Sequence, residues 1–152
     1  MTTVILQTTM GDVTIELLDA TMPITTGNFR KLVEKRFYDG TIFHRVIPNF
    51  MIQGGDPEGT GFGGPGYTIK DELPTNNRNA RGTIAMANAG PNTGGSQFFI
   101  NVVDNNRLDR KHPTFGRVLS GMEVVDAISR TPRDDEDRPR TKVTIRKANL
   151  LP

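Results

Sequence analysis

Apolar and polar residues alternate over several short stretches of the chain, which is the pattern of strands with one buried face. Two such stretches, residues 4–8 and 13–17, flank the turn Thr9-Met10-Gly11-Asp12. The chain is therefore predicted to open with a β-hairpin. Further strands are predicted where apolar runs lie between turn residues: 42–46, 51–54, 67–70, 83–87, 98–102, 115–118 and 141–148.

Two segments have helical spacing instead. In residues 23–36, Pro23 suits a first helical turn, and Phe29, Leu32 and Val33 form an apolar stripe. A second, shorter helix is predicted for residues 123–129. Many short strands, turns rich in glycine and proline, and only two helices predict an all-β barrel or sandwich.

The length of 152 residues suits one domain with its own hydrophobic core, and a single domain spanning residues 1–152 is predicted. The glycine-rich stretch 54–66 is predicted to be a loop, because a strand pattern resumes after it. No apolar run approaches the roughly 18 residues that cross a bilayer, and no secretory signal is visible. The absence of cysteine excludes disulfides and fits a reducing compartment, so a cytoplasmic location is expected.

The net charge of +2 is spread along the chain with both signs. The densest charged run, residues 133–140, interleaves four acidic residues with three arginines. A nucleic-acid binder needs a stripe of one sign with aromatic residues for stacking. The run is therefore interpreted as a solvated loop, and binding to nucleic acid is not expected.

Two further patterns point away from common enzyme classes. Residues 59–64 match G-x-G-x-x-G, but Pro65 and a strand pattern follow in place of the helix that a dinucleotide site requires. The two histidines, His44 and His112, are too few for a catalytic zinc site of three protein ligands. No metal or cofactor is therefore expected.

A stronger signal comes from two strands that place unexpected side chains on the face opposite the core. In residues 97–102, alternation places Phe98 and its period-two neighbours inward, so that Gln97, Phe99 and Asn101 share the other face. Met51 and Gln53 likewise share a face opposite Ile52. An outward phenylalanine between two amides is either covered by a loop or forms the floor of a binding groove, and the pattern leaves both alternatives open.

The chemistry of residues 43–56, F-H-R-V-I-P-N-F-M-I-Q-G-G-D, favours binding over attack. The stretch supplies a cation, a neutral amide and apolar side chains, but no nucleophile or metal cluster. Such a set suits a peptide-like group that is held without being cleaved.

Three segments of the chain resemble the cyclophilins, the cyclosporin-binding family of peptidyl-prolyl cis-trans isomerases. They are F-H-R-V-I-P-N-F-M-I-Q-G-G-D at 43–56, M-A-N-A-G-P-N-T-G-G-S-Q-F-F-I at 86–100 and L-D-R-K-H-P-T-F-G-R-V at 108–118. The resemblance implies a closed eight-stranded antiparallel β-barrel capped by two α-helices. It also implies isomerisation of X-Pro bonds without a covalent intermediate or cofactor.

By the same resemblance, Arg45, Gln53 and Asn88 are the expected catalytic residues. The residues expected to bind the substrate are Phe50, Met51, Ala87, Gln97, Phe99, Leu108 and His112. The implied partners are proline-containing peptides and unfolded or flexible protein segments. Apart from the resemblance, the lack of a long apolar run means that no membrane association is expected, and nothing in the sequence suggests more than a monomer.

One position departs from the family pattern. Cyclosporin-sensitive members often have tryptophan just before the position of Leu108, where this chain has Arg107. Weak binding of cyclosporin is therefore expected, with catalysis retained. A function from another class stays open at this point: a non-catalytic module that docks a proline-containing loop of a partner in the same groove.

Overall fold

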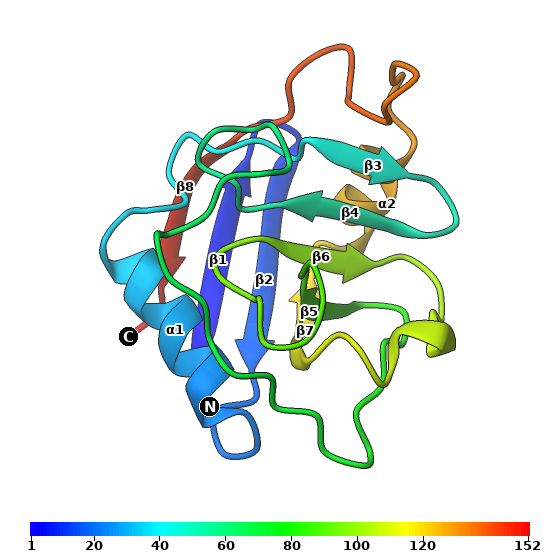
Figure 1. Ribbon diagram of the computed structural model, residues 1–152. Helices are drawn as coiled ribbons and strands as arrows, with labels where there is room; N and C mark the ends of the chain where they lie inside the picture. The colour runs from blue at the N-terminus through cyan, green and yellow to red at the C-terminus, as the bar shows by residue number, and fades with distance from the viewer.

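The computed structural model describes residues 1–152. Its centre is a curled antiparallel sheet of eight strands in the order β3-β4-β6-β5-β7-β2-β1-β8 (Figure 1). The strands are β1 (Thr3–Thr8), β2 (Gly11–Leu17), β3 (Arg45–Ile47), β4 (Met51–Gly54), β5 (Thr83–Met86), β6 (Phe98–Asn101), β7 (Thr114–Ser120) and β8 (Ile145–Leu150). The predicted opening hairpin is confirmed as β1 and β2, which pair from Thr3↔Glu16 to Thr8↔Gly11.

Short backbone links join the two ends of the sheet into a barrel. Strands β3 and β8 form no ladder with each other, but the segments that precede them are bridged at Ile42↔Thr144. The Phe43 amide donates to the Val143 carbonyl at 3.0 Å, and the Ile145 amide donates to the Thr41 carbonyl at 2.8 Å. The strand predicted at 42–46 therefore begins later, at Arg45, because residues before it serve this closure.

Two α-helices lie at opposite sides of the barrel (Figure 1): α1 (Pro23–Glu34) and α2 (Met122–Ser129). Pro23 occupies the first turn of α1 as predicted, and Phe29, Leu32 and Val33 are buried. The N-terminus of α1 has no local side-chain cap. A distant carboxylate replaces it, because Glu72 accepts the amide hydrogens of Ile24 and Thr25 at 3.2 and 2.7 Å. A short 3-10 helix, η1 (Asn106–Leu108), precedes β7.

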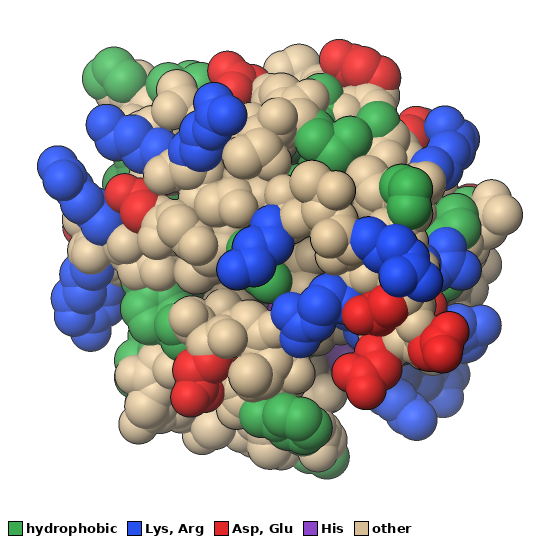
Figure 2. Space-filling model, turned by 90° about the horizontal axis from the view of Figure 1, so that it is seen from above, with side chains coloured by type: hydrophobic (Ala, Val, Ile, Leu, Met, Phe, Trp, Pro, Cys, Tyr) green, Lys and Arg blue, Asp and Glu red, His purple; other side chains and the backbone are tan.

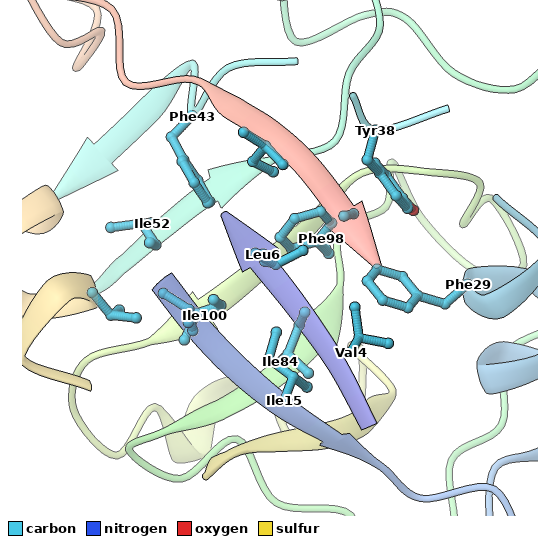
Figure 3. Close-up of a cluster of buried hydrophobic side chains, with 14 of the residues drawn as sticks. Val4, Leu6, Ile15, Phe29, Tyr38, Phe43, Ile52, Ile84, Phe98 and Ile100 are labelled. Atoms are coloured by element: carbon cyan, nitrogen blue, oxygen red, sulfur yellow. The ribbon is translucent and has the colours of Figure 1, made fainter. Parts of the chain in front are cut away.

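The barrel interior is filled by a cluster of 24 buried apolar residues (Figure 3). Phe29 from α1 packs against Tyr38 and Phe98, with ring centroids 5.1 and 5.7 Å away. Phe98, Ile100 and Val102 all belong to this cluster, as the alternation in β6 predicts. Burying this apolar surface is the main stabilising contribution to the fold.

One predicted strand is wrong, and the end of another is misplaced. Residues 67–70 form only the isolated bridge Ile69↔Gly94, because the segment runs over α1 instead of joining the sheet. Its Tyr67 hydroxyl donates to the Asn28 side chain of that helix. The last strand runs over 145–150, not 141–148. Neither α-helix has the length and apolar character that crossing a membrane would require.

Candidate active site

The register of the sheet places three of the sequence-predicted residues in one row on the outer face of the barrel. Arg45 of β3 pairs with Gln53 of β4, and Gln53 pairs with Phe99 of β6. Phe99 in turn pairs with Ala85 of β5. Directly paired residues point to the same side of a sheet. The row therefore carries a cation, an amide and an aromatic ring across three neighbouring strands, of which only β6 is distant from the others in sequence.

A second, smaller apolar cluster includes two residues of this row. Met51, Ala85 and Phe99 are buried together on the outer face, with Phe50, Ala87 and Leu108 packed against them. Phe99 is only 4% exposed although it points away from the main core. The sequence left open whether Phe99 is covered by a loop or forms the floor of a groove, and both hold: neighbouring segments cover most of the ring, and its remaining surface is the floor of a pocket.

This pocket has a volume of about 280 Å³ and nine lining residues. All nine belong to the set predicted from the sequence: Arg45, Phe50, Met51, Gln53, Ala87, Asn88, Phe99, Leu108 and His112. Gln97 lies outside it, in a neighbouring groove of about 620 Å³ that also reaches Gln53, Ala87 and Asn88. Arg107 does not line the pocket either, and stands at its rim over Phe50.

A chain of side-chain amides holds Arg45 in place. The Gln97 Nε2 group donates to the carbonyls of Gly61 and Gly63 at 3.0 and 2.9 Å, which leaves its oxygen facing Gln53. Gln53 Nε2 donates to that oxygen at 3.0 Å, and Gln53 Oε1 accepts from Arg45 Nη1 at 3.3 Å. Each donor fixes the orientation of the next amide. The glycine-rich loop therefore determines where the guanidinium points.

The loop itself is organised around the buried carboxylate of Asp56. Its two oxygens accept the amide hydrogens of Glu58, Thr60, Gly61 and Gly63. Burial disfavours ionisation of this carboxyl, but the four amides outweigh burial and lower the Asp56 pKa below its usual value. Because these N–H groups already bind an internal anion, the G-x-G-x-x-G pattern of residues 59–64 has no free cradle for a phosphate.

The opposite wall of the pocket is set by His112 and Asn88. His112 Nδ1 lies 2.9 Å from the Met86 carbonyl, so this nitrogen carries the hydrogen and Nε2 is left to the pocket. The imidazole meets the Phe99 ring edge to face at 5.3 Å. Asn88 Nδ2 donates to the Lys111 carbonyl at 2.8 Å, while the Asn88 backbone N–H and C=O have no partner within the protein. Those two backbone groups are available to a bound peptide.

Sequence reasoning did not find the residues that position the pocket walls. Buried Asn105 donates to the Phe50 carbonyl at 2.9 Å and to the Asn101 side chain at 2.8 Å. Asn101 Nδ2 donates a hydrogen bond to the Asn79 side-chain oxygen at 3.1 Å, and Asn79 Nδ2 donates to the His112 carbonyl at 3.1 Å. The outward placement of Asn101 in the β6 pattern was the available signal, but its partners come from loops whose path the pattern does not reveal.

Residues 3–150 match the family described as cyclophilin type peptidyl-prolyl cis-trans isomerase/CLD. The chain belongs to the cyclophilin family. A Neurospora crassa protein named peptidyl-prolyl cis-trans isomerase-like 1 is 49% identical, over 99% of this chain and 94% of its own length. The Schizosaccharomyces pombe isomerase ppi1 is 47% identical over 99% of this chain and its full length.

The fold agrees with this assignment. A Cryptosporidium parvum cyclophilin-type isomerase, solved by crystallography in the presence of the dipeptide Ala-Pro, superimposes with a TM-score of 0.95 at 35% identity. The match covers 99% of both chains. This cyclophilin therefore has the family fold over its described length, as the resemblance in the sequence implied, and its activity class is peptidyl-prolyl cis-trans isomerase.

Proposed function

We propose that the 280 Å³ pocket holds the proline ring of an X-Pro bond, and that Arg45 stabilises the twisted amide. The observation that carries this proposal is the juxtaposition in one pocket of an apolar floor and a hydrogen-bonded guanidinium. The apolar proline ring would contact Phe50, Met51, Phe99 and Leu108. Arg45 lines the same pocket and is bonded to Gln53, so it would face the substrate backbone.

The reaction requires no bond to be broken. Cis and trans forms of an X-Pro bond differ by about 1 kcal/mol, and amide resonance separates them by a barrier of about 18 to 20 kcal/mol. Rotation removes the resonance and localises a lone pair on the proline nitrogen. A fixed N–H donor aimed at that nitrogen binds the twisted form more tightly than either planar form, which is the condition for catalysis.

The remaining residues have positioning roles in this proposal. The free backbone N–H and C=O of Asn88 hold the substrate chain, so that the proline ring stays fixed while the preceding carbonyl rotates. Gln53 keeps Arg45 oriented through the amide chain from Gln97. His112 is a polar wall that donates no proton to the reaction.

Magnitudes show that Arg45 cannot act alone. A rate gain of about 10⁵ corresponds to about 7 kcal/mol of differential stabilisation. One charged hydrogen bond contributes about 1.5 to 3 kcal/mol. The balance comes from excluding water around the amide and from the fit of the pocket to the twisted form.

The substrates proposed are proline-containing peptides and flexible protein segments, since a shallow outer-face pocket admits an extended chain. The test is the exchange of cis and trans peaks of a short Ala-Pro peptide, measured by NMR at catalytic amounts of protein. We expect accelerated exchange. A protein that binds the peptide, seen as chemical-shift changes, but leaves the exchange rate at its uncatalysed value would be a docking module, and the proposal would be abandoned.

A further inference from the structure

A second pocket, of about 300 Å³, lies beside the proline pocket and shares Arg45 and Gln53 with it. Its other lining residues are His44, Thr60, Gly61, Glu136 and Arg138, and none of the lining residues is hydrophobic. The two pockets therefore meet at the Arg45 guanidinium and the Gln53 amide. The first pocket is lined mostly by hydrophobic residues, and the second pocket is polar. A peptide held in the first has a neighbouring residue close to the second.

The mixed-charge run 133–140, which the sequence favours as a solvated loop, supplies one wall of this polar pocket. The loop is attached to the edge of the sheet, because the Val46 amide of β3 donates to the Asp137 carbonyl at 2.8 Å. Asp134 accepts the amide hydrogens of Glu136 and Arg138 at 2.9 and 3.1 Å, which shapes the loop. Figure 1 shows this segment passing β3 after α2.

Charged side chains of both signs crowd one side of the face shown in Figure 2. Within the loop, Arg133 pairs with Asp137 at 3.0 Å, so these two charges offset each other. Arg138 and Glu136, by contrast, form no ion pair and no side-chain hydrogen bond. Both side chains remain available to a ligand.

The charge balance of the pocket favours an anion. Arg45 is bonded only to the neutral amide of Gln53. Among the side chains that line the pocket, Arg45 and Arg138 are therefore two cations against the single exposed carboxylate of Glu136. The charge of nearby Asp56 is already bound by its loop amides. His44, 6% exposed, lines the same pocket, and its buried Nδ1 has no hydrogen-bond partner in the protein.

We propose that this pocket is a subsite for an acidic side chain of the substrate, and that Arg138 is its specificity-determining residue. The inference rests on the proposed function, since it assumes that the X-Pro bond lies in the adjoining pocket. An extended chain advances about 3.4 Å per residue. Because the two pockets share Arg45 and Gln53, the selected aspartate or glutamate is within about three residues of the proline.

The experiment uses a set of peptides that share one Ala-Pro core. Glutamate or glutamine is placed in turn at each of the positions flanking the core, and kcat/KM is measured for each peptide. At one position we expect the glutamate peptide to exceed its glutamine partner by about three- to fivefold. The advantage should shrink in high salt, because the pocket is open to solvent.

Three variants assign the effect. Arg138→Gln should abolish the glutamate advantage, so that each glutamate peptide and its glutamine partner are turned over equally, and Glu136→Gln should increase the advantage. Arg140→Gln is the matched control, since Arg140 is an exposed arginine of the same loop that does not line the pocket. Circular dichroism verifies that each variant is folded.

The possible failures are separable. No glutamate advantage at any position, or an advantage that survives in Arg138→Gln, would overturn the acidic subsite while the glutamine peptides still report isomerase activity. Absence of turnover with every peptide would instead overturn the proposed function on which the subsite depends.

Discussion

The guanidinium of Arg107 lies over the ring of Phe50, with its Cζ 4.9 Å from the ring centroid. Arg107 belongs to η1 and forms no ion pair, so this cation–π contact is its main interaction. Phe50 is also one of the residues that line the 280 Å³ pocket. The departure from the family's frequent tryptophan thus places a positive charge at the rim of the site.

This arrangement predicts weak cyclosporin binding and its recovery by Arg107→Trp. An indole covers apolar surface and donates one N–H, whereas a guanidinium must be partly desolvated against a neutral, apolar ligand. We expect the variant to bind cyclosporin at least about tenfold more tightly, or about 1.4 kcal/mol. Titration calorimetry on both proteins measures the difference. Equal affinities would mean that the arginine stem already covers the ligand as an indole would.

Replacing Arg45 by alanine should lower kcat/KM for an X-Pro peptide by at least about 100-fold, or about 2.7 kcal/mol. Stability should change little, because Arg45 is exposed and its only hydrogen-bond partner is Gln53. Arg146→Ala, an exposed arginine of β8 away from the site, is the control. Near-normal turnover by a folded Arg45→Ala protein would remove this residue from the mechanism.

Because rotation about the X-Pro bond moves no proton, kcat/KM should be nearly flat between about pH 7 and 9. An NMR exchange assay at fixed ionic strength measures the profile. A bell-shaped dependence near neutrality, with one limb absent in a His112→Gln variant, would indicate acid-base chemistry and contradict the mechanism.

His44 predicts a pH dependence of stability. Burial lowers its pKa, Asp56 opposes this, and the charges of Arg138 and Arg45 lower it further. The unfolded chain takes up a proton below about pH 6.5, whereas the folded protein does not until lower pH. Stability should be full above that value and fall as pH drops through it, by at most about 1.4 kcal/mol per pH unit.

Urea denaturation at pH 8 and pH 5.5 checks this sign. His44→Gln removes the titrating group, so the variant should lose less stability than the wild-type protein over the same interval. A variant that loses as much as the wild type would show that other groups account for the dependence.

Asp56→Asn should destabilise the protein by about 1 to 3 kcal/mol, since one carboxylate oxygen becomes an amide that cannot accept the loop hydrogens. The variant should also lower kcat/KM, because the carbonyls of Gly61 and Gly63 orient Gln97 and, through Gln53, Arg45. Denaturation and turnover are compared with Asp135→Asn, an exposed aspartate. Unchanged stability of Asp56→Asn would show that the loop does not depend on the carboxylate.

Much of the fold follows from the sequence, for a local reason. Alternation within one strand decides which side chains enter the core, so Phe98 and Phe99 could be assigned to opposite faces without knowing any partner strand. The apolar stripe of α1 is equally local. The candidate pocket residues followed from motif resemblance, and the structure brings nearly all of them together.

Contacts between distant segments were decided only by the tertiary structure. Residues 67–70 have a strand pattern but do not join the sheet, because Tyr67 and the nearby Glu72 bind α1 instead. The charged run 133–140 reads locally as solvated, yet its backbone is attached to β3 and places Arg138 beside Arg45. Composition and periodicity indicate which side chains of a segment face solvent and which face the core. They do not determine which other segment lies beside it. That depends on strand register and on contacts that close the barrel between residues more than a hundred positions apart.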